Sequence, residues 1–83
     1  MLGYVGSMVT IHRDGNLRVV IFSNDHALPH VHVFIGDGQA KINLLDRELV
    51  WVRRMKRTEV RTAIDLVATR QREFLERWEE IHG

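Results

Sequence analysis

The residues best suited to chemistry lie in one short segment, NDHALPHVHV at residues 24–33. Three of the five histidines of the chain fall within it. His30 and His32 are two positions apart, so a strand would project both imidazole rings to one side. Asp25 and His26 precede that strand in a loop and could bend back toward the rings. The segment therefore predicts a cluster of imidazoles with a carboxylate, and Asp25, His26, His30 and His32 are its candidate catalytic residues.

Such a cluster has three interpretations, and the residues leave all three open. Neutral imidazoles with a carboxylate bind Zn²⁺ or another borderline divalent ion, and an open fourth position would make the site catalytic. Histidine also titrates near neutrality, so His30 and His32 could act as base and acid in RNA cleavage, oriented by Asp25. In the third interpretation the histidines only hydrogen-bond to the loop and the sheet. The spacing H-x-x-x-H-x-H is less specific than a metal motif such as H-E-x-x-H.

A basic run follows the last expected strand. Its five cations within nine positions are Arg53, Arg54, Lys56, Arg57 and Arg61. These cations could contact a phosphate backbone, with Trp51 beside them as a stacking surface. We therefore predict Arg53, Arg54, Lys56 and Arg57 as candidate nucleic-acid-binding residues. The other interpretation is a solvated edge that prevents sheet extension or docks an acidic partner.

Alternation of apolar and polar residues predicts the strands that must position these side chains. Strands are expected at residues 8–13, 17–22, 30–35 and 39–45, with a short fifth strand at 48–53. The glycines of Asp14-Gly15-Asn16 and Gly36-Asp37-Gly38 are typical of tight hairpin turns. Pro29 cannot donate a ladder hydrogen bond, which places residues 23–29 in a loop.

The same alternation assigns the side chains to two faces of the sheet. The core face of the third strand is predicted to carry Val31, Val33 and Ile35. The opposite face is predicted to carry His30, His32 and Phe34. If the neighbouring strands pair antiparallel in a suitable register, it also carries His12, Arg18, Lys41 and Asn43. The open face is therefore expected to be polar and to bear the histidines.

The hydrophobic period becomes helical after the basic run. Residues 58–82 are predicted to form one helix, with Thr58 as its N-cap and Gly83 after its last periodic residue. At about 1.5 Å per residue this helix is longer than the strands, so its far end should overhang the sheet or kink near Gln71. The order of elements predicts an α+β fold, an antiparallel sheet of four to five strands packed on one long C-terminal helix.

Length and composition set the domain organisation. The 83 residues, 45% apolar and 28% charged, suit one globular domain with a single core. We expect a single α+β domain at residues 8–83, preceded by a loose extension at 1–7. The chain has no cysteine, which excludes disulfides and thiolate metal sites. Since nothing indicates an oxidising compartment, the cytoplasm is the expected location. No stretch approaches the roughly 20 apolar residues of a membrane span.

The string NDHALPHVHV resembles the strand entry of small bacterial proteins grouped as domain of unknown function 4160. Their hallmark is a similar order of Asp-His, proline and His-x-His. The resemblance runs from about Met8 to Trp78 and includes Gly36, Ala40, Ile42 and the E-x-x-E-R-W sequence at residues 73–78. Leu28 stands where the family usually has the first proline of a Pro-Pro pair.

This resemblance implies a genetic context rather than a reaction. Such proteins are often encoded beside another small protein in an arrangement like a toxin-antitoxin pair, and the family supplies no established catalytic residues. We therefore predict a component of a toxin-antitoxin-like module that binds or cleaves RNA. The alternatives are a non-enzymatic protein-interaction or regulatory module and a His-liganded protein with a divalent metal. The expected partners are a small protein encoded alongside, RNA, or a second copy of the chain, and whether the protein is an enzyme stays open.

Overall fold

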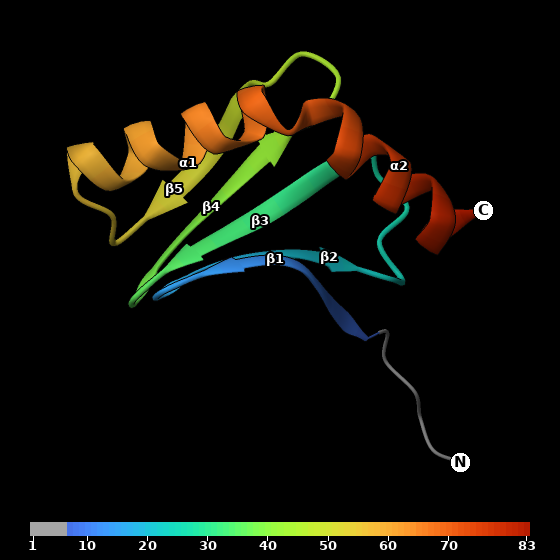
Figure 1. The fold of residues 1–83 in the computed structure, drawn as a ribbon, viewed down its shortest axis with the longest axis horizontal. Helices are drawn as coiled ribbons and strands as arrows, with labels where there is room; N and C mark the ends of the chain where they lie inside the picture. The colour runs from blue at the N-terminus through green and yellow to red at the C-terminus, as the bar shows by residue number, and fades with distance from the viewer. Residues whose placement is uncertain (1–6) are drawn as a thin grey trace.

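The computed structural model describes residues 7–83 as a five-stranded antiparallel sheet with two helices packed on one face (Figure 1). The elements are β1 (Met8–Asp14), β2 (Leu17–Phe22), β3 (His30–Ile35), β4 (Gly38–Asn43), β5 (Leu49–Arg53), α1 (Arg57–Thr69) and α2 (Gln71–His82). The strands lie side by side in sequence order. This arrangement confirms the α+β class and the antiparallel sheet. The predicted N-terminal extension lies outside the described residues, apart from Ser7.

Two glycine turns close the first and third hairpins at the same end of the sheet. Gly15 has φ 60° and Gly36 has φ 55°, in the left-handed region that glycine adopts without steric cost. The N–H of Gly36 donates to the carbonyl oxygen of Asn16 at 3.2 Å, so the two turns are tied together. The loop between β2 and β3 and the turn between β4 and β5 therefore lie at the opposite end, where α2 packs.

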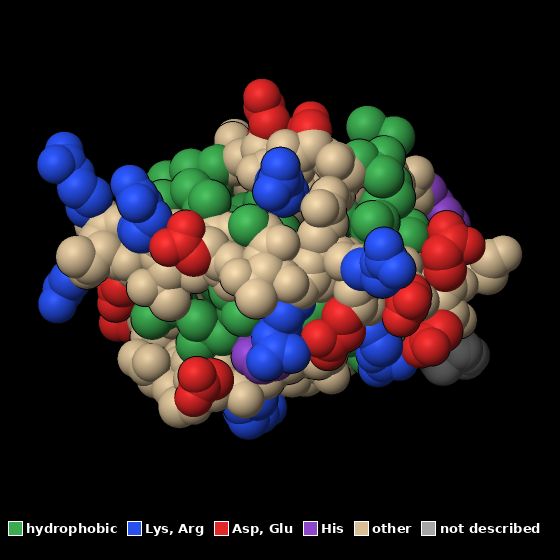
Figure 2. Space-filling view, turned by 45° about the horizontal axis from the view of Figure 1, so that its top comes forward, with side chains coloured by type: hydrophobic (Ala, Val, Ile, Leu, Met, Phe, Trp, Pro, Cys, Tyr) green, Lys and Arg blue, Asp and Glu red, His purple; other side chains and the backbone are tan. Residues whose placement is uncertain are grey.

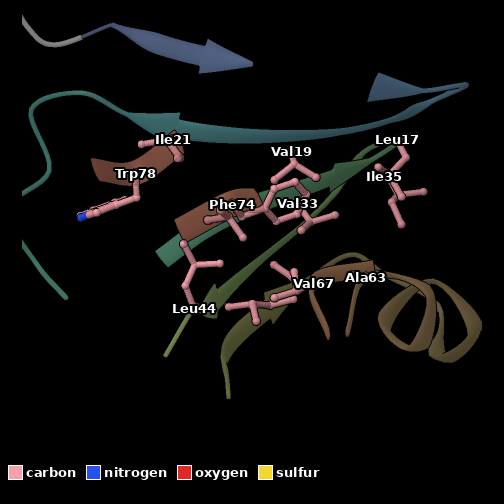
Figure 3. Close-up of a cluster of buried hydrophobic side chains, with 13 residues drawn as sticks. Leu17, Val19, Ile21, Val33, Ile35, Leu44, Ala63, Val67, Phe74 and Trp78 are labelled. Carbon is pink, nitrogen blue, oxygen red and sulfur yellow. The ribbon is translucent and has the colours of Figure 1, made fainter. Parts of the chain in front are cut away.

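The hydrophobic core lies between the sheet and the two helices (Figure 3). The sheet contributes alternate residues of three strands and one residue after β4, namely Leu17, Val19, Ile21, Val31, Val33, Ile35, Ala40, Ile42 and Leu44. The helices contribute Ala63, Val67, Phe74 and Trp78. Burial of each large aliphatic or aromatic side chain stabilises the folded state by roughly 1.5 to 3 kcal/mol. Val31, Val33 and Ile35 all lie in this core, which confirms the predicted core face of β3.

The prediction of one long C-terminal helix is wrong, because the helix breaks at Arg70. This residue has φ −112° and ψ 23°, and its N–H donates to Leu66 O at 2.9 Å to end α1. Its carbonyl accepts from the N–H of Phe74 at 2.9 Å to begin α2. The side chain of Gln71 donates to Leu44 O at 2.6 Å, which anchors the break to the turn after β4. The kink expected near Gln71 thus separates two helices, and α2 packs on the sheet end where β3 begins.

The start of α1 also differs from the prediction by one to two residues. The helix begins at Arg57 with Lys56 as its N-cap, so Thr58 lies inside the first turn. The carboxylate of Glu59 accepts the backbone N–H of Lys56 at 2.8 Å. This contact satisfies a backbone donor at the start of the helix that has no intrahelical partner.

A bulge in β1 moves His12 to the core side of the sheet. Thr10 pairs with Val20, but His12 pairs with Val19, because the register shifts between them. The His12 ring accordingly lies 6.2 Å from the Phe74 ring, between centroids. The predicted position of His12 on the open face is therefore wrong, since a bulge interrupts the alternation on which it was based.

The other side chains predicted for the open face lie there. Arg18 pairs with Phe34, Lys41 with His32 and Asn43 with His30, and directly opposite residues share a face.

Among residues 7–83, no helix is long and apolar enough to cross a membrane.

Candidate functional site

The loop between β2 and β3 turns back on itself and brings Asp25 to the start of β3. The N–H of Asp25 donates to the carbonyl oxygen of Phe22 at 3.1 Å, which makes the first turn of the loop. At its other end the carbonyl oxygen of Pro29 accepts the N–H of Leu44 at 2.9 Å, so the loop is held to the end of β4. The Asp25 carboxylate consequently lies 2.8 Å from Nε2 of His30.

His30 is held between a backbone carbonyl and this carboxylate. Its Nδ1 lies 2.7 Å from Leu28 O, and since a carbonyl oxygen only accepts, Nδ1 carries a hydrogen and donates it. Nε2 faces Asp25, and the Trp78 ring lies 5.2 Å away, between centroids. The side chain is 1% exposed. Metal-binding histidines are commonly oriented in this way, with Nδ1 donating to a backbone carbonyl and Nε2 facing the ion.

His32 lies on the open face and is nevertheless buried, because aromatic rings close around it. Its ring centroid is 4.7 Å from that of Phe22, 5.3 Å from that of His30 and 5.7 Å from that of Trp51. The side-chain amide nitrogen of Gln39 lies 3.1 Å from its Nδ1. Each of these neighbours replaces water around the imidazole.

This environment determines the charge of His32. Desolvation by burial, followed by the nearby His30 ring, lowers the pKa of His32 from 6.5 to about 4, and Lys41 acts in the same direction against the opposing effect of Asp25. His32 is therefore neutral at physiological pH. The neutral imidazole is the form that binds a metal or accepts a proton.

Asp25, His30 and His32 form a cluster of three potential metal ligands, here called the Asp-His-His trio. One ligand atom from each residue lies within 4.8 Å of the others. Ligand atoms around a tetrahedral Zn²⁺ are about 3.3 Å apart, given bonds of about 2.0 to 2.1 Å. The side chains would therefore move by at most about 1.5 Å to surround an ion. The Asp25 side chain is 33% exposed, so the trio can be reached from solvent on that side.

The structure brings together three of the four predicted catalytic residues. His26 is exposed and does not belong to the trio, although it neighbours Asp25 in sequence. Gln39 and Trp78 also neighbour the two histidines, and neither was predicted from the sequence. Strand register could have placed Gln39 on the histidine face, because it lies opposite Phe34. No local pattern could have placed Trp78, since its position depends on the break at Arg70.

The predicted nucleic-acid-binding run lies at the other end of the sheet. Figure 2 shows Lys and Arg side chains gathered at the end of the molecule where α1 begins, and Arg53, Arg54, Lys56 and Arg57 are all exposed. Arg53 lies opposite Gln39, which lies opposite Phe34. Phe34 is four residues from His30 along β3, a separation of about 13 Å. The basic run and the trio therefore do not form one site.

The Asp-His-His trio lies in the part of the chain that matches a known protein family. Residues 16–79 match the family described as Domain of unknown function (DUF4160). The matched region contains all three residues of the trio, the core strands β2 to β4 and both helices as far as Glu79. No curated protein and no solved structure matches the chain.

Proposed function

The chain belongs to the DUF4160 family, and we propose that it is a metal-binding domain in which Asp25, His30 and His32 hold a divalent ion such as Zn²⁺. The match over residues 16–79 includes the string NDHALPHVHV and confirms the predicted family. The single observation that carries the proposal is the convergence of two imidazoles and a carboxylate within 4.8 Å.

The donor set favours borderline transition metals. Imidazole nitrogens suit Zn²⁺, Cu²⁺, Fe²⁺ and Ni²⁺, whereas Mg²⁺ and Ca²⁺ prefer oxygen ligands. Three protein ligands leave a coordination position open, as in catalytic zinc sites. A bound ion would supply Lewis acidity and a more acidic water at that position, which is the chemistry of hydrolysis.

Each residue of the trio has a distinct part in holding the ion. Asp25 supplies the anionic ligand at the solvent side, and Leu28 O fixes the His30 ring through Nδ1. Ligation by Nε2 of His32 requires the hydrogen on Nδ1. The side-chain oxygen of Gln39 can accept that hydrogen once the amide turns over, because its nitrogen and oxygen occupy equivalent positions.

Burial favours an ion over an RNA phosphodiester as the occupant. A catalytic acid or base must approach the proton it moves to within about 2.6 to 3.2 Å. His30 is 1% exposed and His32 is 8% exposed, so a phosphodiester would need the loop and the surrounding rings to open. A small ion needs only the opening beside Asp25. Metal binding therefore requires less rearrangement than cleavage by His30 and His32.

The proposal is tested by calorimetric titration of the metal-stripped protein with Zn²⁺ and Co²⁺. We expect one ion per chain, and Co²⁺ should give the visible absorption of a low-coordinate site. Asp25→Asn keeps the shape of the side chain but removes its charge, so affinity should fall at least about tenfold, as for changes around known metal ligands. His30→Ala removes a ligand and should abolish binding.

His26→Ala is the matched control, because it removes an exposed histidine one residue from Asp25 and should leave affinity unchanged. Circular dichroism shows whether each variant is folded. Binding that survives both Asp25→Asn and His30→Ala in folded protein would contradict the assignment. A folded wild-type protein that binds neither ion would leave the trio as a structural hydrogen-bond network.

The toxin-antitoxin-like role and the small protein partner stay predictions from the family resemblance. Copurification of a stoichiometric partner encoded beside the gene is their direct test. Such a partner is compatible with the metal site, because the trio is confined to one end of the sheet.

A further inference from the structure

The sheet face that the helices leave uncovered carries cations and aromatic rings. Direct cross-strand pairing places on it the cations Arg13, Arg18, Lys41 and Arg53 and the aromatic residues Phe22, Phe34 and Trp51. The acidic residue within the five strands is Asp14, which pairs with the core residue Leu17 and so points to the other face. The strand residues of this open face are therefore positively charged, without a carboxylate among them.

Two of these cations lie against aromatic rings. Cζ of Arg18 is 4.7 Å from the Phe34 ring centroid, and Cζ of Arg53 is 5.0 Å from that of Trp51. Phe34 and Trp51 are partly exposed, so neither ring belongs to the core. They lie on β3 and β5, two strands apart and offset by two residues, a separation of about 12 Å. The face thus offers separate rings, each with a guanidinium group over it.

We propose that the open face of the sheet binds single-stranded nucleic acid. Every base has a π-face that stacks on aromatic rings, and Arg and Lys beside the rings contact the phosphates. The charge of the face is complementary to a polyanion. Single strands fit better than duplexes, because bases within a duplex are already stacked on each other and the face presents no protruding helix or ribbon to a groove.

The proposed nucleic-acid site on the open face differs from the Asp-His-His trio and from the basic run. It includes Arg53 from the basic run, but its other cations come from β1, β2 and β4. Arg54, Lys56 and Arg57 follow β5 directly and can extend the phosphate contacts beyond the edge of the sheet. Phe22 and Trp51 of this face also pack against His32 of the trio. The contacts to nucleic acid are made by cations and aromatic rings and not by the metal ligands, so binding should not require a bound metal.

The test is fluorescence anisotropy of a labelled single-stranded RNA of mixed sequence, with the protein in EDTA at several salt concentrations. The variant Arg18→Gln/Lys41→Gln removes two cations of the open face. Its affinity should fall at least about tenfold, and the magnitude of the slope of log K against log salt should decrease by about 1.4, since each contact to a single strand contributes about 0.7. Phe34→Leu, which keeps the charge, should weaken binding by about tenfold through lost stacking.

Arg72→Gln/Arg77→Gln is the matched control, since it removes the same charge from α2 on the opposite side of the molecule. Its affinity and salt slope should equal those of the wild type. Equal weakening by the control pair would overturn the proposal by showing only general attraction to a basic protein. It is also overturned by the absence of binding at low salt, by equal affinity for a duplex, or by poly-glutamate competing as well as RNA, which would indicate an acidic protein partner.

Discussion

His30 and His32 are two positions apart on one strand, yet their surroundings differ. The Nε2 atom of His30 lies 2.8 Å from a carboxylate, whereas Nδ1 of His32 contacts the neutral amide of Gln39. Phe22 and Trp51 also exclude water from His32. An imidazole without a direct anionic partner and without water resists protonation, which is why the pKa of His32 is lowered to about 4.

The lowered pKa of His32 predicts a loss of stability in acid. Between pH 6.5 and about 4 the unfolded chain binds a proton at His32 that the folded chain does not, so the free energy of unfolding falls as pH falls. One pKa unit equals about 1.4 kcal/mol, which predicts a loss of about 3 kcal/mol across this range. Urea denaturation of the metal-free protein at pH 7, 5.5 and 4 measures this loss in the free energy of unfolding.

His32→Gln removes the titrating group and should remove most of this acid dependence. His26→Gln changes an exposed histidine and should retain it. If the His32→Gln protein loses as much stability between pH 7 and pH 4 as the wild type, another group is responsible.

At the scale of elements, the break between α1 and α2 connects the helices to the site. A continuous helix would carry its second half past the sheet, whereas α2 turns so that Trp78 lies 5.2 Å from His30, between ring centroids. Neither proline nor glycine occurs near Arg70. The Gln71 side chain provides the tertiary contact at the break, through its bonds to Leu44 O at 2.6 Å and Leu45 O at 3.2 Å.

Gln71→Ala should therefore lower the free energy of unfolding by about 1 to 2 kcal/mol, since two carbonyl groups lose their donor. Alanine itself favours helix, so local propensity does not explain a loss. Arg72→Ala, at the exposed neighbouring position, is the control and should cost less than about 0.5 kcal/mol. Equal denaturation midpoints for the two variants would show that the Gln71 bonds do not stabilise the break.

At the scale of the whole molecule, one core joins the sheet to both helices. The net charge is +1, and Figure 2 shows Lys and Arg side chains gathered at the end where α1 begins, whereas carboxylates and cations are mixed around α2. Phe74 is fully buried where α2 meets the sheet and reaches the His12 ring across the core.

Phe74→Ala should cost about 3 to 5 kcal/mol, the range measured for buried phenylalanine. A domain of this size has a total stability of about 4 to 12 kcal/mol, so the substitution should remove between about a quarter and all of it. Its adjacent control, Leu75→Ala, truncates a partly buried side chain and should cost clearly less. Urea denaturation followed by circular dichroism compares them, and a smaller loss for Phe74→Ala would contradict this view of the core.

The sequence by itself determined the strands, their turns and the common side of His30 and His32. These features depend on neighbours in the chain. Gly15 and Gly36 can adopt positive φ, and a strand projects every second side chain to one side. The family resemblance rests on short motifs spread over about residues 8–78, and the match of residues 16–79 confirms the family.

Only the tertiary structure decided which candidate residues converge and what state they are in. The path of the loop between β2 and β3 brings Asp25 to His30 and leaves His26 exposed. The bulge in β1 moves His12 to the core side of the sheet. The break at Arg70 brings Trp78 over His30, and the closing of rings around His32 lowers its pKa. Each of these outcomes depends on packing between residues far apart in sequence, which local periodicity and propensity do not encode.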